Sequence, residues 1–248
     1  MRKPRVTAPE KHAIYHLTAK TLNEQPSFDE VDLEHLRQIL FRTAKFANIQ
    51  VFTYCFLPER LHALIEVPPA KDKLRYRDEE LIQRYAELIG EPRNPDQPEF
   101  RKNYLKMRVK QVKDRFRESR HSAAEARATI LGQMHDLSAF GKLALQKMTI
   151  WYNTRHERTG PLWSTRFRSE LLDRDSPEFE TRAAYIDLLP VQHGLVEDPA
   201  DYPFSGYGAS EQNDTPLPGL STLVNEIFDQ VPPEKTLDAY RTLLLGDR

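Results

Sequence analysis

Two short apolar runs that meet at a tight turn place the strongest constraint on how this chain folds. They are "IQVFTYCFLP" and "RLHALIEVP", residues 49–58 and 60–68, and both are rich in β-branched and aromatic residues that alternate along the chain. Such runs are typical of strands, and a connection as short as the one at Pro58 and Glu59 is typical of a β-hairpin. We therefore expect an antiparallel sheet in this part of the chain.

The order of the other predicted elements indicates the fold class. Strands are predicted over 12–20 and 164–174, and helices over 27–48, 77–90, 104–131, 136–157 and 177–190. Ser27 or Asp29 can cap the first helix, Gly90 ends the second, and Asp136 or Ser138 opens the fourth. The order is a split βαβ pattern, which predicts an α+β fold with an antiparallel sheet and helices packed on one face.

The predicted elements also suggest how the chain is divided. Residues 1–210 are expected to form one domain, with a helical insertion over about 70–135. Within the insertion, three prolines between 91 and 103 predict a loop. Residues 211–248 resemble a linker followed by two short helices, and we expect them to form a C-terminal appendage.

Positive charge is concentrated in one part of the chain. Between Arg101 and Arg174 there are 17 Lys and Arg residues against seven Asp and Glu residues, a local charge of +10 in a chain whose net charge is −1. Such segregation is typical of a face that binds a polyanion, for example a nucleic acid. Solvated helix faces are the other interpretation, because Lys and Arg are common on exposed helices.

Several classes of protein are excluded by simple patterns. No apolar run approaches the roughly 20 residues that a helix needs to span a bilayer, so we expect no membrane partner. The N-terminal "MRKPRVTAPEKHAIY" is basic, but no apolar stretch follows it, so we expect no signal peptide. Cys55 is the only cysteine, which excludes an internal disulfide and favours a cytoplasmic location.

Four stretches, in order along the chain, resemble one protein family. They are "YHLTAK", "TYCFLPERLHALIEVP", "LSAFGKLALQKMTIWYNTRHERTGPLWSTRFRSELL" and "AAYIDLLPVQHGLVEDPADYPFSGYG". This pattern is similar to that of the REP-associated tyrosine transposases, a branch of the single-tyrosine HUH transposases that act on single-stranded DNA. The resemblance covers about residues 5–210 and implies a ferredoxin-like HUH fold and a DNA partner, single-stranded or hairpin. Members of the family occur as monomers or dimers, so a homodimer is one expected state.

The resemblance implies a metal-dependent mechanism. In the family, two histidines on one strand and a third ligand on a helix hold Mg²⁺ or Mn²⁺. A tyrosine one turn before that third ligand attacks the scissile phosphate and forms a 5′-phosphotyrosine link. In this chain the second histidine corresponds to His62 and the tyrosine to Tyr185, whereas Arg60 and Leu189 stand at the positions of the other two ligands.

These two departures predict a degenerate metal site. A guanidinium has no lone pair to give to a metal, and leucine has no donor atom. A hard cation on a single imidazole would stay mostly hydrated, so we expect metal binding and strand cleavage to be impaired. Two alternatives stay open. Glu59, or less favourably Glu66 or Asp187, could replace a ligand, or Arg60 could bind the phosphate bidentately in place of the cation.

Basic and aromatic residues around "GPLW" are candidates for direct contact with nucleic acid. Arg155, Arg158, Arg166 and Arg168 flank this stretch at a density that suits phosphate binding, and Trp163 within it could stack on an unpaired base. An exposed basic turn and a tryptophan packed in the core are the corresponding alternatives.

Three functions are compatible with these residues. The first is a transposase-type protein that binds single-stranded or hairpin DNA, with cleavage weakened or lost. The second is an active tyrosine transposase with a rearranged metal site. The third is an RNA-binding regulatory module, because the split βαβ sheet is also the scaffold of RNA-recognition folds. The aromatic sheet signature of those folds is not evident here, which counts against the third function.

Overall fold

The computed structural model describes residues 6–22, 28–89 and 98–246, so the candidate cap Ser27, the predicted helix end at Gly90 and most of the proline-rich loop lie outside the described residues. No described helix is both long and apolar enough to cross a membrane. In chain order the helices and strands are β1 (Ala13–Lys20), α1 (Glu30–Ala47), β2 (Gln50–Leu57), β3 (Arg60–Val67), η1 (Ala70–Arg75), α2 (Asp78–Ile89), α3 (Pro98–Glu118), α4 (Arg120–Leu131), α5 (Leu137–Arg155), β4 (Arg168–Leu172), α6 (Pro177–Gln192), η2 (Pro199–Asp201), α7 (Gly206–Gln212), α8 (Pro218–Phe228), η3 (Pro233–Lys235) and α9 (Thr236–Leu245).

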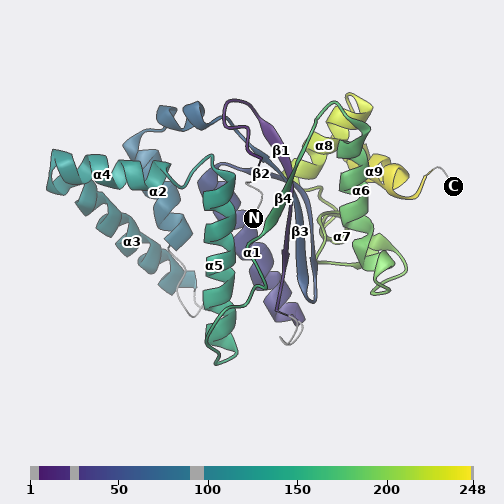
Figure 1. The fold of residues 1–248 in the computed structure, drawn as a ribbon, viewed down its shortest axis with the longest axis horizontal. Coiled ribbons are helices and arrows are strands. Elements are labelled where there is room, and N and C mark those ends of the chain that lie inside the picture. The colour runs from purple at the N-terminus through teal and green to yellow at the C-terminus, as the bar shows by residue number, and fades with distance from the viewer. Residues whose placement is uncertain (1–5, 23–27, 90–97, 247–248) are drawn as a thin grey trace.

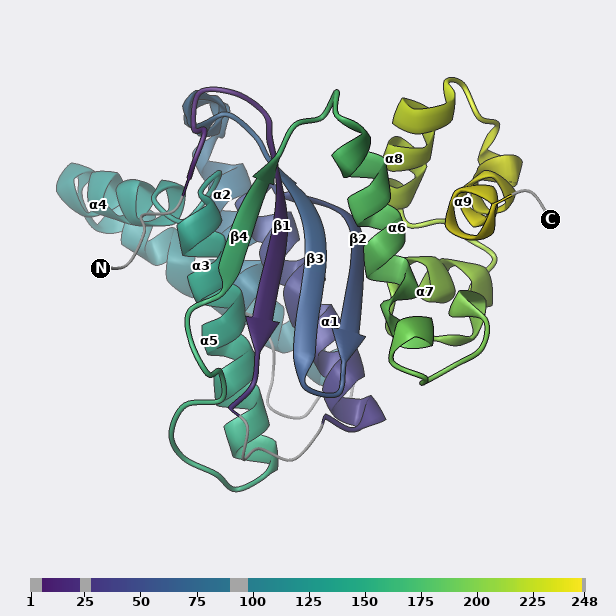
Figure 2. The same ribbon diagram turned by 45° about the vertical axis from the view of Figure 1, so that its right-hand side comes forward.

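The four strands form one antiparallel sheet in the order β2-β3-β1-β4 (Figure 2). β3 lies between β2 and β1, with Cys55 on one side of His62 and Thr18 on the other. β4 pairs with the other edge of β1, where Thr18 is opposite Arg168. α1 connects β1 to β2 across β3, which is the split βαβ arrangement. The predicted α+β class and the antiparallel sheet are confirmed.

Helices cover both faces of the sheet, whereas the sequence predicted helices on one face. In Figure 1, α1 and α5 lie on one side of the strands and α6 lies on the other, together with α7, α8 and α9. On the first side Phe41 of α1 packs edge-on against Tyr54 of β2, and on the second Phe179 of α6 packs against Phe52 of β2. The physical reason is that β2 is buried along almost its whole length, and a strand with apolar side chains on both faces needs cover on both.

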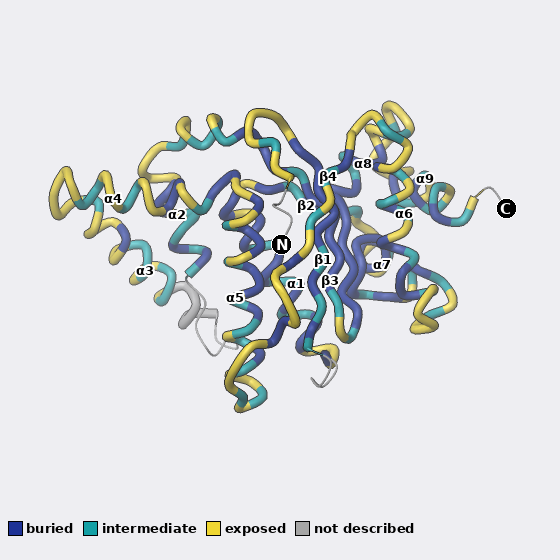
Figure 3. The backbone as a smooth tube through the Cα atoms, in the orientation of Figure 1, coloured by how far each residue is buried: buried dark blue, intermediate teal, exposed yellow. Residues whose placement is uncertain are grey.

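The basic helix predicted over 104–131 is two helices. α3 ends at Glu118 and α4 begins at Arg120, because Ser119 is extended and its Oγ accepts a hydrogen bond of 3.0 Å from the Ser122 N–H as an N-cap. α2, α3 and α4 lie on the side of the sheet away from α6 (Figures 1 and 2). Much of the surface of α3 and α4 is exposed (Figure 3).

The C-terminal helices pack onto the sheet at β2. Gly219 lets α8 approach this strand closely, since a Cβ added there would lie 1.7 Å from the Val51 carbonyl oxygen. On α9, the Tyr240 hydroxyl donates a hydrogen bond of 2.7 Å to Asp187 on α6. Residues of α8 and α9 therefore belong to the same hydrophobic core as the strands.

Candidate functional site

His16, His62 and Tyr185 meet on the face of the sheet that α6 covers. Because Thr18 lies opposite His62, His16 is the diagonal neighbour of His62 on the same face. α6 holds Tyr185 over both histidines, with its ring centroid 6.3 Å from that of His16 and 6.2 Å from that of His62. The two histidines are buried, whereas 39% of Tyr185 is exposed, so the phenol lies at the entrance to the cluster.

Arg182, three residues before Tyr185 on α6, begins a chain of hydrogen bonds through the two histidines. Its Nη1 lies 2.9 Å from His16 Nδ1, and His16 Nε2 lies 3.1 Å from His62 Nδ1. A guanidinium only donates, so His16 Nδ1 accepts, and a neutral His16 then carries its proton on Nε2 and donates it to His62. Arg182 therefore sets the direction of the whole chain and leaves the His62 proton on Nε2.

Burial keeps both imidazoles neutral. It lowers the pKa of His16 to about 4, with the positive charge of Arg182 as a second cause. It lowers the pKa of His62 to about 3, where His16 and Arg60 are the next contributors. The hydrogen-bond chain requires a neutral His16, because a protonated ring would have no acceptor for Arg182.

The two positions that the family resemblance assigns to further metal ligands offer no ligand. The Arg60 guanidinium has no lone pair, and its Nε lies 3.4 Å from a carboxylate oxygen of Glu59. Leu189, one turn after Tyr185, is 1% exposed and has no donor atom. Neither residue fits a divalent cation.

The hydrogen-bond chain also engages His62, the one residue of this sequence that matches a metal ligand of the family. His62 Nδ1 accepts from His16, and a metal on Nε2 would need the His62 proton moved to Nδ1. His16 Nε2 would then have to accept, and its Nδ1–H would face the donors of Arg182. In the part of the chain that the structure describes, no group of three His, Cys, Asp or Glu side chains is placed to hold a metal ion.

The carboxylates considered as replacement ligands are engaged elsewhere. Glu66 forms an ion pair with Arg174. Asp187 points into the core, where it accepts a hydrogen bond of 2.6 Å from Thr53. Glu59 forms an ion pair with Arg60, the next residue along the chain. Each contact satisfies the carboxylate without a metal.

A cavity of about 760 Å³ opens beside the two histidines, and Tyr185, Arg168 and Arg182 are among its lining residues. Arg168 is exposed and forms no ion pair within the described ranges. Arg182 also binds a carboxylate oxygen of Glu170 at 2.6 Å. Two guanidinium groups and a phenol thus face one space, and such donors suit an anionic oxygen such as that of a phosphate.

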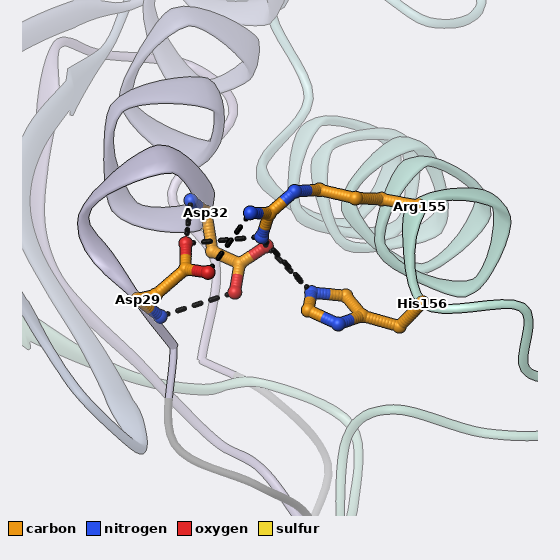
Figure 4. A network of polar contacts seen from close by, with 4 residues as sticks. All are labelled: Asp29, Asp32, Arg155 and His156. Carbon is orange, nitrogen blue, oxygen red and sulfur yellow. Dashed lines mark hydrogen bonds and ion pairs between the residues drawn. The ribbon is translucent and has the colours of Figure 1, made fainter.

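Arg155 is held within the protein by two carboxylates (Figure 4). It contacts Asp32 at 2.6 Å and Asp29 at 2.9 Å, and His156 contacts Asp32 at 2.8 Å. Asp29 is also the N-cap of α1, so this network ties the end of α5 to the start of α1. Phosphate binding by Arg155 stays a prediction, and it would require these ion pairs to break.

The other residues predicted around "GPLW" differ in exposure. Trp163 is buried and its indole N–H donates a hydrogen bond of 3.1 Å to a backbone carbonyl of α5, which favours the alternative of a tryptophan packed in the core. Arg158 lies over the Tyr152 ring, with 5.5 Å between the guanidinium carbon and the ring centroid. Arg166 is exposed, as a phosphate contact requires.

Three residues of this region were not singled out from the sequence. Arg182 and His193 lie three residues before and eight residues after Tyr185, a spacing that places all three on one helix face and could have identified them. The charge of His193 also lowers the pKa of His62. His16 carried no such signal, because its closeness to His62 depends on how β1 pairs with β3.

Comparisons with known proteins give likenesses among solved structures only. Neither the protein-family models nor the curated proteins contain a match to this chain. Among solved structures, one described as a REP-associated tyrosine transposase bound to a REP hairpin resembles it with a TM-score of 0.45 and 14% sequence identity. The alignment covers 86% of this chain and 87% of that one. At this TM-score and identity the likeness assigns neither a family nor a function.

Proposed function

We propose that this protein binds single-stranded or hairpin DNA at the cavity beside His62 and Tyr185, without the metal-dependent cleavage of the transposases that its sequence resembles. The observation that carries the proposal is the hydrogen-bond chain from Arg182 through His16 to His62. It fixes cationic and N–H donors beside the cavity, and it uses the lone pairs that a cation would need.

The cavity is lined by Glu170 and Glu178 as well as by Arg168 and Arg182, so the support for an anionic ligand comes from the donors of particular side chains and not from the net charge. The exposed Arg168 is free to form a bidentate contact with a phosphate, and the Tyr185 phenol can donate to the same group. Arg60 lies two residues before His62 on β3 and therefore on the same face of the strand. It can supply a further phosphate contact at the edge of the site. The binding site then consists of fixed donors in place of a metal ion.

An active transposase is the second candidate, and the exposure of Tyr185 favours it. A nucleophile must reach the substrate, and 39% of this side chain is exposed next to the cavity. A phenol with a pKa near 10 still needs activation, and the described residues offer no ligand set for a cation that would supply it. DNA binding without cleavage is therefore the function that the geometry supports best.

Binding is tested with a fluorescent DNA hairpin titrated with the parent protein, Arg168→Gln, Arg60→Ala and the control Arg77→Gln. Arg77 is exposed and lies outside the cavity, so its variant removes the same charge elsewhere. We expect Arg168→Gln to weaken binding by about 10-fold, as loss of a charged contact does, and Arg77→Gln to leave it nearly unchanged. Arg60→Ala should also weaken binding; an unchanged affinity would remove Arg60 from the site.

Cleavage is tested with the same hairpin in the presence of Mg²⁺ or Mn²⁺, by searching for a covalent protein–DNA adduct. We expect no adduct from the parent protein and equal DNA binding with and without the metal. An adduct that disappears in Tyr185→Phe would overturn the proposal and support the active transposase. An RNA hairpin bound more tightly than the DNA hairpin would overturn it in favour of an RNA-binding module.

A further inference from the structure

Four cationic side chains form one line along α3. They are Lys106, Lys110, Lys113 and Arg117, separated by four, three and four residues, and we call them the α3 stripe. At 100° per residue, this spacing keeps all four within about 60° of the helix circumference. Over 11 residues the stripe extends for about 16 Å.

The stripe is exposed and unpaired. All four side chains are exposed, and none of them forms an ion pair with another described residue. Elsewhere in the insertion cations do find partners, as Arg127 does with Asp78. Like charges three and four residues apart destabilise a helix, so the stripe opposes the helix that carries it. A polyanion bound along the stripe would remove this repulsion.

The remaining faces of α3 mix apolar, acidic and basic residues, with Arg108 and Arg115 on the side opposite the stripe, at about 200° and 180° from Lys106. Val112 is buried and Phe116 is half-buried, so that face packs against neighbouring helices. Asp114 and Glu118 lie outside the stripe on the helix circumference, at about 80° and 120° from Lys106. No aromatic residue belongs to the stripe, so it has nothing on which a base could stack.

The stripe and the cavity lie far apart in the fold. α3 lies on the side of the sheet that carries α1 and α5, whereas the cavity lies under α6 on the other side (Figures 1 and 2). A DNA phosphate in the cavity therefore cannot also contact the stripe. A ligand on the stripe is either another segment of the same DNA or a separate molecule.

We propose that the α3 stripe binds the phosphate backbone of a DNA duplex segment, such as a hairpin stem, independently of its base sequence. This inference rests on the proposed function, because it assigns a second contact to the same DNA. Over about 16 Å a duplex presents about ten phosphates, enough to meet all four cations. Lys and Arg contacts to phosphates position a protein on DNA without reading its bases.

The test compares two variants that lose the same charge. One replaces Lys106, Lys110, Lys113 and Arg117 by Gln; the matched control replaces the exposed Lys11, Lys71, Lys142 and Lys235 by Gln. Affinity is measured for hairpins with the same loop and either a long or a short stem, over a series of salt concentrations. Circular dichroism verifies that both variants keep the helical content of the parent.

We expect the stripe variant to lose affinity for the long-stem hairpin. The slope of log K against log salt concentration should fall in magnitude by about 0.9 for each lost phosphate contact, or about 3 to 4 in total. The short-stem hairpin should be much less affected, and the control variant should keep most of the parental slope.

Each of the other outcomes would overturn one of the two proposals or a specific part of one. Equal slopes for the stripe and control variants would overturn the stripe as a DNA contact, while weaker binding in Arg168→Gln would leave the proposed function standing. Weaker binding in the stripe variant alone would retain the stripe and overturn the cavity as the DNA site. A stripe effect seen only with an RNA stem would overturn the assignment to DNA, and a parent that binds no hairpin would overturn both proposals.

Discussion

Asp187 joins four elements of the fold through one buried carboxyl group. It accepts hydrogen bonds from the Thr53 hydroxyl at 2.6 Å, the Tyr240 hydroxyl at 2.7 Å and the Tyr207 backbone N–H at 2.9 Å. These donors lie on β2, α9 and α7, while Asp187 itself lies on α6. Burial raises the pKa of Asp187 to about 6, although the donors act to lower it.

This raised pKa makes the contribution of Asp187 to the free energy of unfolding depend on pH. The unfolded group titrates near 3.8 and the folded group near 6, so between these values the folded state keeps a proton that the unfolded state has lost. The stabilisation from this proton is complete below pH 3.8 and is lost as the pH rises through about 6. A difference of about two pKa units corresponds to roughly 3 kcal/mol, which is the stabilisation present at low pH and lost at neutral pH.

Asp187→Asn removes the titration and keeps the shape of the side chain. We expect the free energy of unfolding of the parent, minus that of the variant, to decrease by about 2–3 kcal/mol from about pH 4 to about pH 7 in urea denaturation. The difference is the quantity to measure, because the lowered pKa values of His16 and His62 make the stability of both proteins rise over the same range.

A difference that stays constant with pH would refute this reasoning, since it would mean that the three donors keep the Asp187 carboxylate ionised throughout. Asp187→Ala serves as a second variant. It should be destabilised by about 3 kcal/mol or more at every pH, because buried donors lose their acceptor.

Two further predictions concern packing. Gly219→Ala places a Cβ 1.7 Å from the Val51 carbonyl oxygen, so α8 must move away from β2; thermal denaturation should report a loss of about 1–3 kcal/mol, and an unchanged melting temperature would contradict the close approach. Asp32→Asn removes the buried carboxylate that pairs with the exposed Arg155 and should cost about 1–2 kcal/mol in urea denaturation. Equal stability of this variant and the parent would show that the network in Figure 4 contributes little.

Local patterns in the sequence were sufficient for most of the strands and helices. Alternating apolar residues predicted the hairpin, and Pro177 marked the start of α6 as predicted. The break at Ser119 was missed because its neighbours are good helix formers and no glycine or proline interrupts them. The cover on both faces of the sheet was missed because helical periodicity does not say which face of a sheet a helix will bury.

For the candidate site too, some features follow from the sequence alone and others only from the tertiary structure. Residue identity alone decided that Arg60 and Leu189 cannot hold a metal, because that follows from the chemistry of their side chains. The tertiary structure decided that His16 lies beside His62, and that Trp163 is buried. These facts depend on strand register and on packing between segments far apart in the chain, and no local pattern encodes them.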